Sequence, residues 1–145
     1  MSNEFPRYPR IPGMGDANLR EVAPGLWVGG HRARQIAWAA VVDLIGVPGD
    51  PKVPTLSVPM QDGQPFARGA LDAITDFVGE HHRSGPILIH CRAGFSRSVS
   101  AAYAVCRRMG LGHAESIRRV RSRDADPAGE TFRSARQWAD SRGYP

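Results

Sequence analysis

The feature that most constrains the fold is a continuous apolar run, Ile-Leu-Ile at residues 87–89, which ends at His90 and a glycine-containing turn. A short apolar run without polar alternation is typical of a central strand buried on both faces. After the turn, apolar residues return with helical spacing from Val99 to Met109, and Gly110 closes that segment. A buried strand followed directly by a helix predicts an α/β domain.

The segments on either side continue this alternation of strands and helices. Short apolar or β-branched runs, stopped by Gly or Pro, predict further strands at residues 26–28, 41–45 and 55–58. Helical spacing of apolar residues predicts helices at residues 32–39, 68–82, 114–120 and 132–139. We therefore expect an α/β fold with a central, mostly parallel sheet flanked by helices.

The chain length and composition fit a single soluble domain. The 145 residues are 41% hydrophobic and 23% charged, which is ordinary for a globular protein with one core. Residues 1–21 are rich in Pro, Gly and Arg, so they are predicted to form an irregular arm before a single domain over residues 22–145. No apolar run approaches the roughly 20 residues that span a membrane, and the N-terminal residues contain no stretch of signal-peptide type. We expect a cytoplasmic protein.

The formal charge of +5 comes almost entirely from arginine, since Lys52 is the only lysine. Genomic composition and selection for anionic partners explain this excess about equally well. The densest cluster contains no aromatic residue, whereas nucleic-acid binding would need interleaved aromatics; it comprises Arg118, Arg119, Arg121 and Arg123. We predict no nucleic-acid partner, and the positive charge is compatible with phosphorylated substrates.

The segment from His90 to Ser98 carries the chemistry. It lies at a strand–loop–helix junction, where free backbone N–H groups and the helix dipole favour an anion. Five residues between Cys91 and Arg97 are enough to curl into a ring of amides around one tetrahedral anion. Gly94 allows close approach of the backbone, and Arg97 adds a planar fork of donors. The candidate phosphate-binding residues are Arg92, Ala93, Gly94, Phe95, Ser96 and Arg97.

The helix dipole and the positive charge of Arg97 also act on the sulfur of Cys91. An ordinary cysteine pKa of about 8.5 falls to about 3.5–7.5 beside helix N-termini and cations, so Cys91 is a candidate thiolate nucleophile that needs no separate base. The Ser98 hydroxyl is placed to donate to this sulfur, and His90 to order the loop through hydrogen bonds. Cys106 lies about 20 Å further along the predicted helix, so we expect a small buried residue there and no disulfide.

These residues resemble the signature of the protein tyrosine phosphatase superfamily, which is His-Cys, five residues, Arg and then Ser or Thr. The form HCRAGFSRS resembles most the dual-specificity phosphatases. Residues 22–29 are similar to the first strand of that family, and the resemblance extends to about residue 142. It implies a cysteine-dependent phosphatase that hydrolyses phosphate monoesters through a thiophosphoryl-enzyme intermediate, with Cys91 as nucleophile.

The resemblance also implies a general acid, because the leaving oxygen must be protonated. The family supplies an aspartate from a mobile loop about 30 residues before the cysteine, and Asp62 fits that place. Asp-Gly is also a common turn dipeptide, so a purely structural role for Asp62 is the alternative. Asp43, Asp72 and Asp76 are weaker candidates because they fall within a predicted strand or helix.

The substrate class is less constrained by the sequence. Relatives that prefer phosphoinositides often carry lysines in the loop, and those acting on RNA 5′ ends usually have Asn-Arg-Thr in place of Ser96-Arg97-Ser98. We expect a phosphoprotein substrate carrying phosphotyrosine and phosphoserine or phosphothreonine. The alternatives are a phosphoinositide phosphatase, a non-catalytic phosphate-binding module and a sulfur-transfer enzyme of the rhodanese type. We expect no cofactor and no metal, since the adjacent His81 and His82 do not face one site.

Overall fold

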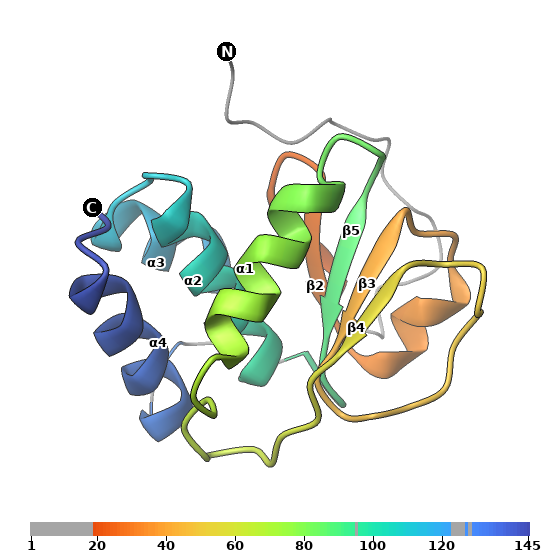
Figure 1. Ribbon diagram of the computed structural model, residues 1–145, viewed down its shortest axis with the longest axis horizontal. Helices are drawn as coiled ribbons and strands as arrows, with labels where there is room; N and C mark the ends of the chain where they lie inside the picture. The colour runs from red at the N-terminus through yellow and green to blue at the C-terminus, as the bar shows by residue number, and fades with distance from the viewer. Residues whose placement is uncertain (1–18, 95, 123–126, 128) are drawn as a thin grey trace.

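A five-stranded sheet forms the centre of the computed structural model, which describes residues 19–94, 96–122, 127 and 129–145 (Figure 1). The strands lie in the order β1 (Arg20–Ala23), β2 (Leu26–Gly29), β5 (Ile87–His90), β3 (Ala40–Asp43) and β4 (Thr55–Ser57). β1 pairs with β2 in antiparallel fashion, and the other neighbours are parallel. The predicted α/β fold with a mostly parallel sheet is confirmed.

The register of the sheet brings three strand ends together. Gly29 at the end of β2 and Asp43 at the end of β3 both lie opposite His90 at the end of β5. Because parallel strands share one carboxyl edge, the residues that follow them converge on the same place. The segment that begins at Cys91 therefore leaves the sheet from its middle strand.

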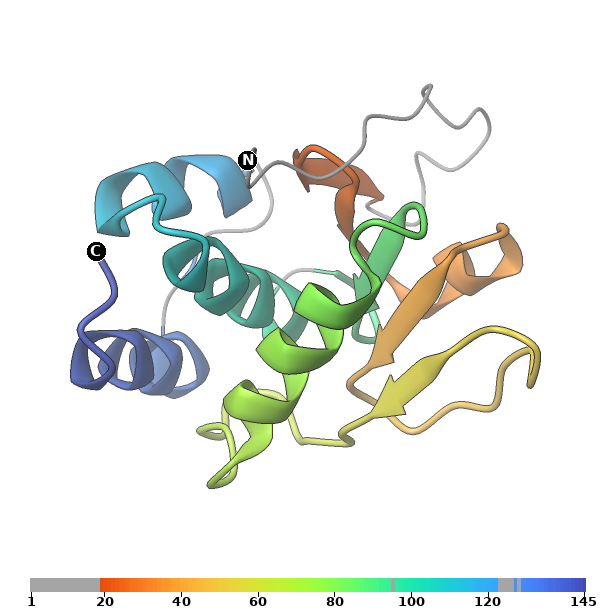
Figure 2. The ribbon, with the colours of Figure 1, turned by 45° about the horizontal axis from the view of Figure 1, so that its top comes forward.

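Within the described residues, four helices lie on one side of the sheet, and a short 3-10 helix, η2 (His31–Gln35), lies on the other (Figures 1 and 2). The helices are α1 (Ala70–His81), α2 (Arg97–Arg108), α3 (His113–Val120) and α4 (Gly129–Ser141). α2 is buried from Ser98 to Arg107 because it packs on β2 and β5 while α1, α3 and α4 surround it.

The alternation of side chains in β5 explains the two layers of the core. Ile87 and Ile89 pack into the cluster beneath the four helices, whereas Leu88 joins Trp27 and Trp38 on the opposite face. Successive side chains of a strand point to opposite faces, so a strand covered on both faces needs apolar residues throughout. This is the arrangement that the Ile-Leu-Ile run predicted.

Several predicted boundaries were wrong. Strand β1 takes in Arg20 and Glu21, which were expected to belong to the irregular arm, while residues 1–18 of that arm lie outside the described residues. The helix expected at 32–39 is the shorter η2. The strand expected at 41–45 ends at Asp43, because the Asp43 carboxylate accepts the N–H groups of Ile45 and Gly46 and turns the chain.

Two further observations bear on the predicted partners. No helix within the described ranges is long and apolar enough to cross a membrane. Arg118 and Arg119 of the arginine cluster lie on α3 and pair with Glu115, which agrees with a solvated helix face. Arg123 of that cluster falls outside the described residues.

Candidate active site

The loop that carries Cys91 (residues 91–96, the Cys91 loop) joins the end of β5 to the start of α2. The Sγ atom of Cys91 accepts a hydrogen bond from the Gly94 N–H at 3.2 Å, and it lies 3.4 Å from Ser98 Oγ. Cys91 and Ser98 are both buried, whereas the side chains of Arg92 and Ala93 are exposed. The structure thus brings Cys91, Gly94 and Ser98 together as predicted, while Phe95 lies outside the described residues.

The environment of Cys91 lowers the pKa of its thiol. Burial acts in the opposite direction and is the largest single influence, but hydrogen bonds from the Ser98 hydroxyl and from the N–H groups of Ser98, Gly94 and Ser96 outweigh it. These donors stabilise the thiolate because they direct partial positive charge at the sulfur. The sequence suggested the helix end and cations as the cause of the shift, whereas the structure attributes it to hydrogen bonds from the loop and the first turn of α2.

Gly94 packs directly against the backbone of Gly29 and Gly30. It has φ +82°, and a Cβ atom at this position would lie 2.8 Å from the Gly29 carbonyl carbon and 3.0 Å from the Gly30 nitrogen. A side chain at this position would clash with the Gly29 and Gly30 backbone, and the positive φ is unfavourable for residues other than glycine. From the sequence, glycine was expected only to stop the strand predicted at residues 26–28, and its contact with the Cys91 loop was not predicted.

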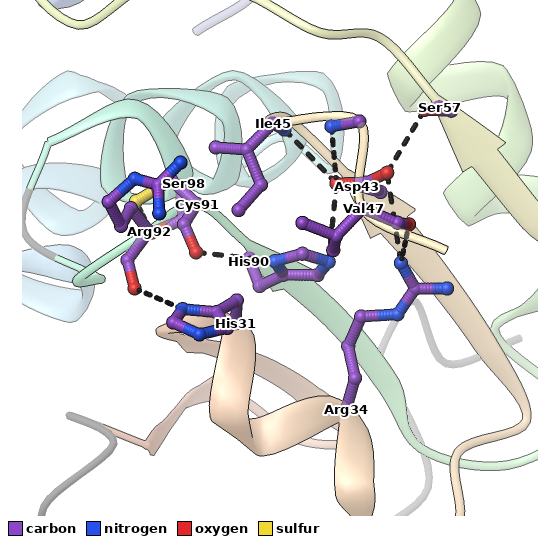
Figure 3. A network of polar contacts seen from close by, with 11 residues as sticks. His31, Arg34, Asp43, Ile45, Val47, Ser57, His90, Cys91, Arg92 and Ser98 are labelled. Carbon is purple, nitrogen blue, oxygen red and sulfur yellow. Dashed lines mark hydrogen bonds and ion pairs between the residues drawn. The ribbon is translucent and has the colours of Figure 1, made fainter. Parts of the chain in front are cut away.

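A second contact fixes the exposed side of the Cys91 loop. The Arg92 carbonyl oxygen accepts the backbone N–H of His31 at 3.2 Å and lies 3.1 Å from His31 Nδ1 (Figure 3). A peptide plane with its carbonyl held in this way cannot rotate freely. His31, the first residue of η2, therefore anchors the loop from the face of the sheet opposite the helices.

A buried polar network supports the loop from below (Figure 3). His90 Nδ1 lies 3.2 Å from the Cys91 carbonyl oxygen, and its Nε2 lies 3.4 Å from Asp43 Oδ1. Burial is the main cause that lowers the pKa of His90 to about 4, so the ring is neutral at neutral pH. With Nδ1–H donating to the carbonyl, His90 orients the peptide that follows Cys91.

Asp43 is the centre of this network. Its carboxylate is 1% exposed and accepts the Ser57 hydroxyl at 3.0 Å in addition to two backbone N–H groups. Arg34 Nη1 lies 3.7 Å from Asp43 Oδ2 and donates to the Val47 carbonyl oxygen at 2.6 Å. These contacts enclose a residue that ranked from the sequence as a weaker general acid, and they make Asp43 a structural support of the strand ends.

Asp62 reaches the site from the loop between β4 and α1 (residues 58–66, the Asp62 loop). Its carboxylate is 64% exposed, and Oδ1 lies 4.0 Å from Arg97 Nε. Arg97 Nη1 also donates to the Met60 carbonyl oxygen at 2.8 Å. The structure therefore places Asp62 beside the arginine of the signature, and Arg97 bridges the two loops, a contact that the sequence did not predict.

The two remaining aspartates engage other parts of the helical layer. Asp72 on α1 pairs with Arg142 at 2.5 Å and accepts the indole N–H of Trp138. Asp76 pairs with Arg108 at the end of α2 at 2.6 Å. Within the described ranges, no group of three or more His, Cys, Asp or Glu residues is placed to hold a metal ion.

No protein-family model and no curated protein sequence matches the chain, whereas many solved structures do. A variant of human DUSP28 is 27% identical, and the match covers 86% of this chain and 94% of that one with a TM-score of 0.73. A mouse putative dual-specificity phosphatase complexed with zinc tungstate is 22% identical over 92% and 91% of the two chains, with a TM-score of 0.68.

A third similar structure is the human tyrosine phosphatase-like serine/threonine/tyrosine-interacting protein. It is 16% identical, and the match covers 86% of this chain and 97% of that one with a TM-score of 0.69. The mouse and interacting-protein matches show a shared fold. The DUSP28 match, at 27% identity, agrees with the resemblance found in the residues around Cys91.

Proposed function

We propose that the chain is a dual-specificity phosphatase of the protein tyrosine phosphatase superfamily, and that it hydrolyses phosphate monoesters with Cys91 as nucleophile; the Cys91 signature and the 27% identical DUSP28 variant support this. The fold supports a phosphatase of this type. The reaction would run in two steps through a covalent phosphocysteine, the thiophosphoryl-enzyme intermediate.

In the first step the Cys91 thiolate attacks phosphorus, so an S–P bond forms as the bond from phosphorus to the leaving oxygen breaks. Asp62 in its protonated form gives its proton to that oxygen, and the leaving group departs as a neutral alcohol or phenol. The N–H groups of the Cys91 loop and the Arg97 guanidinium stabilise the equatorial phosphate oxygens. For this, Arg97 must exchange its contact with Met60 for the phosphate or hold both at once.

In the second step a water molecule attacks the phosphocysteine. Asp62, now a carboxylate, accepts the proton from water, an O–P bond forms and the S–P bond breaks, which releases inorganic phosphate. The Ser98 hydroxyl donates to the departing thiolate, since it already lies 3.4 Å from Sγ. The cycle returns Cys91 and Asp62 to their initial states without a cofactor.

The observation that carries this proposal is the position of the Cys91 sulfur. Three backbone N–H groups and one hydroxyl converge on it and lower its pKa. A buried structural cysteine has the opposite character, and Cys106 provides the comparison within the same chain. Burial raises the pKa of Cys106 to about 12, so it stays a thiol.

For the substrate, we propose phosphoproteins that carry phosphotyrosine and phosphoserine or phosphothreonine. Arg92, Ala93 and Asp62 are all exposed, so the site opens to the surface instead of lying at the base of a deep pocket. A shallow site admits both short and long phosphorylated side chains. A phosphoinositide headgroup is the alternative substrate.

Hydrolysis of p-nitrophenyl phosphate tests the activity directly. Wild type should release nitrophenol, Cys91→Ser should release none, and Asp62→Ala should be slower by about 10²-fold or more. Tungstate should compete with the substrate; the mouse relative is complexed with zinc tungstate. A wild-type protein that binds tungstate but releases no nitrophenol would be a phosphate-binding module, and thiocyanate formation from thiosulfate would favour sulfur transfer.

An active enzyme can then be offered phosphopeptides beside phosphoinositides. The proposal predicts that kcat/KM is higher for phosphopeptides, with both phosphotyrosine and phosphothreonine peptides hydrolysed. Preference for an inositol phospholipid would assign the alternative substrate.

A further inference from the structure

Asp62 occupies the tip of a tight turn. The Gln64 N–H donates to the Gln61 carbonyl oxygen at 3.3 Å, which closes a β-turn with Asp62 and Gly63 at its centre, and Gly63 has φ +80°. A positive φ at the third position of such a turn favours glycine. The direction of the Asp62 carboxylate therefore depends on how the two ends of this turn are held.

The incoming end is held by the sheet and by the arginine of the signature. The Val58 and Met60 N–H groups donate to the carbonyl oxygens of Asp43 and Leu44 at 2.8 and 3.0 Å. The Met60 carbonyl oxygen accepts Arg97 Nη1. This end continues the parallel pairing beyond β3 and β4, so the catalytic edge of the sheet fixes it.

The outgoing end is held by α4, which lies far away in the sequence. Thr131 Oγ1 donates to the Gln64 carbonyl oxygen at 2.8 Å, and the Phe66 N–H donates to Ser134 Oγ at 2.9 Å. The Ser134 hydroxyl donates its own proton to the Thr131 carbonyl oxygen at 2.8 Å. In Figure 1 the segment that follows β4 runs along the lower edge of the molecule to α1, towards the lower end of α4.

Thr131 lies in the first turn of α4, which begins at Gly129, so its hydroxyl has no earlier turn of that helix to donate to. Hydroxyls further along a helix commonly donate back to the preceding turn, as Thr75 does to Leu71 on α1 and Ser141 does to Trp138 on α4. Thr131 is 1% exposed and donates to the Asp62 loop. If that hydroxyl is removed, the Gln64 carbonyl oxygen loses the partner that ties this end of the loop to α4.

We propose that Thr131 and Ser134 are positioning residues for the general acid: α4 holds the outgoing end of the turn and so directs the Asp62 carboxylate at the leaving oxygen. The inference rests on the proposed role of Asp62. The Thr131 hydroxyl bonds to the Asp62 loop, and the Ser134 hydroxyl bonds to that loop and to the Thr131 carbonyl oxygen, so the effect falls on the proton transfers of Asp62. A displacement of about 1 Å at a reacting group can cost up to about 10²-fold in rate.

The test uses the dependence of rate on the leaving group. Phenyl phosphate releases a strongly basic oxygen that needs a proton, whereas a dinitrophenyl ester releases a weakly basic one that departs without it. Thr131→Val combined with Ser134→Ala should lower kcat/KM for phenyl phosphate by about 10-fold or more and leave kcat/KM for the dinitrophenyl ester nearly unchanged, because kcat/KM reports the first step and not the hydrolysis of the phosphocysteine that both substrates share. A general loss of folding would lower both rates together.

Matched variants complete the design. Thr131→Ser keeps a hydroxyl and should restore the wild-type ratio of the two rates, while Ser141→Ala removes a hydroxyl whose hydrogen bond stays within α4. The single variants Thr131→Val and Ser134→Ala serve if the double variant does not fold. The Asp62→Ala variant shows how far the ratio of the two rates falls when the general acid is removed completely.

The outcomes separate the two levels of the proposal. If Asp62→Ala shows no selective loss on phenyl phosphate, Asp62 is not the acid and both proposals are overturned. If Asp62→Ala shows the loss but the Thr131 and Ser134 variants keep the wild-type ratio, the acid assignment stands and the positioning role is overturned. Selective loss in both sets, with restoration by Thr131→Ser, supports the inference.

Discussion

His90 is buried in the folded protein, and this burial makes the stability of the fold depend on pH. It is 0% exposed, with Asp43, Arg34, His31 and the Cys91 peptide around it, and its pKa in the folded protein is lowered to about 4. In the unfolded chain a histidine titrates near 6.5. Between these two values the unfolded state binds the extra proton and the folded state does not.

We therefore expect the free energy of unfolding to fall as the pH is lowered from about 6.5 to about 4. The contribution of His90 over this window is on the order of 3 kcal/mol. In His90→Asn, which keeps an N–H donor but does not titrate, this part of the pH dependence should disappear. Urea unfolding of both proteins at several pH values measures it. Parallel pH profiles for wild type and variant would contradict the assignment.

The two cysteines should differ in reactivity. Hydrogen bonds hold the pKa of Cys91 below its usual value against the effect of burial, whereas burial raises the pKa of Cys106 to about 12. At neutral pH iodoacetamide should alkylate Cys91 of the folded protein and spare Cys106. Mass mapping of wild type, with Cys91→Ser and Cys106→Ser as matched controls, gives the two rates. Equal labelling of both residues, or labelling of Cys106 alone, would exclude the thiolate.

Among the elements, the Cys91 loop depends on glycine for two separate reasons. Its Gly94 combines a positive φ with a close approach to Gly29 and Gly30. Gly110 after α2 has φ +89°, and a Cβ atom there would meet none of the described residues within 4 Å. The two positions share the conformational requirement and differ in packing, so they form a natural pair of substitutions.

Gly110→Ala should cost about 1 kcal/mol, which is the penalty of a left-handed conformation. Gly94→Ala should lower the free energy of unfolding by more than Gly110→Ala does, because the new methyl group displaces the loop from the Gly29 backbone. The Gly94→Ala variant should also lose phosphatase activity, whereas the Gly110→Ala variant should retain it. Urea denaturation together with aryl phosphate turnover measures both effects. Equal destabilisation of the two variants would mean that the loop moves away from Gly29 at little cost.

The sequence predicted the elements better than their ends. The Ile-Leu-Ile run indicated the middle strand and the helical periods indicated α1 to α4, because both signals come from burial on known faces. β1 was missed since Arg-Glu-Val-Ala has only a short apolar stretch. The early stop of β3 depends on the Asp43 carboxylate turning back on its own backbone, and no periodicity reports such a contact.

At the scale of the whole molecule, Arg107 joins the central helix to the C-terminal one. Its side chain is 3% exposed and donates to the Tyr103 hydroxyl at 2.6 Å, to Asp140 at 2.7 Å and to the Tyr144 carbonyl oxygen at 2.8 Å. Asp140 itself is 57% exposed. The buried guanidinium is therefore the common partner of groups on α2, on α4 and beyond it.

Arg107→Met should lower the free energy of unfolding by about 1–3 kcal/mol, because the buried Tyr103 hydroxyl and the half-buried Tyr144 carbonyl oxygen lose their donor. Asp140→Asn should cost less than about 1 kcal/mol, since the exposed carboxylate is solvated and the other bonds of Arg107 remain. Thermal or urea unfolding of the two variants gives the comparison. A larger effect of Asp140→Asn would show that the ion pair, not the buried hydrogen bonds, joins the helices.

The fold was predicted from the alternation of strands and helices along the chain, and the similar solved structures confirm it. The family resemblance was predicted mainly from the residues around Cys91, and the 27% identical DUSP28 variant agrees with it. For the site, the short-range part was predictable: Cys91, Gly94 and Ser98 lie close in sequence and meet as expected. The long-range part was not, because Gly29, His31 and Asp43 reach the loop through strand register, and Thr131 and Ser134 reach the Asp62 loop through helix packing. The catalytic roles stay predictions until activity is measured.

The central claim is that the Cys91 sulfur forms a covalent bond to phosphorus, and rapid acid quenching during turnover of an aryl phosphate tests it most directly. Peptide mass mapping should place one phosphoryl group on the peptide that contains Cys91, and the group should be absent from Cys91→Ser. Turnover without phosphorylated Cys91, or a phosphoryl group on Ser96, Ser98 or His90 instead, would contradict the account.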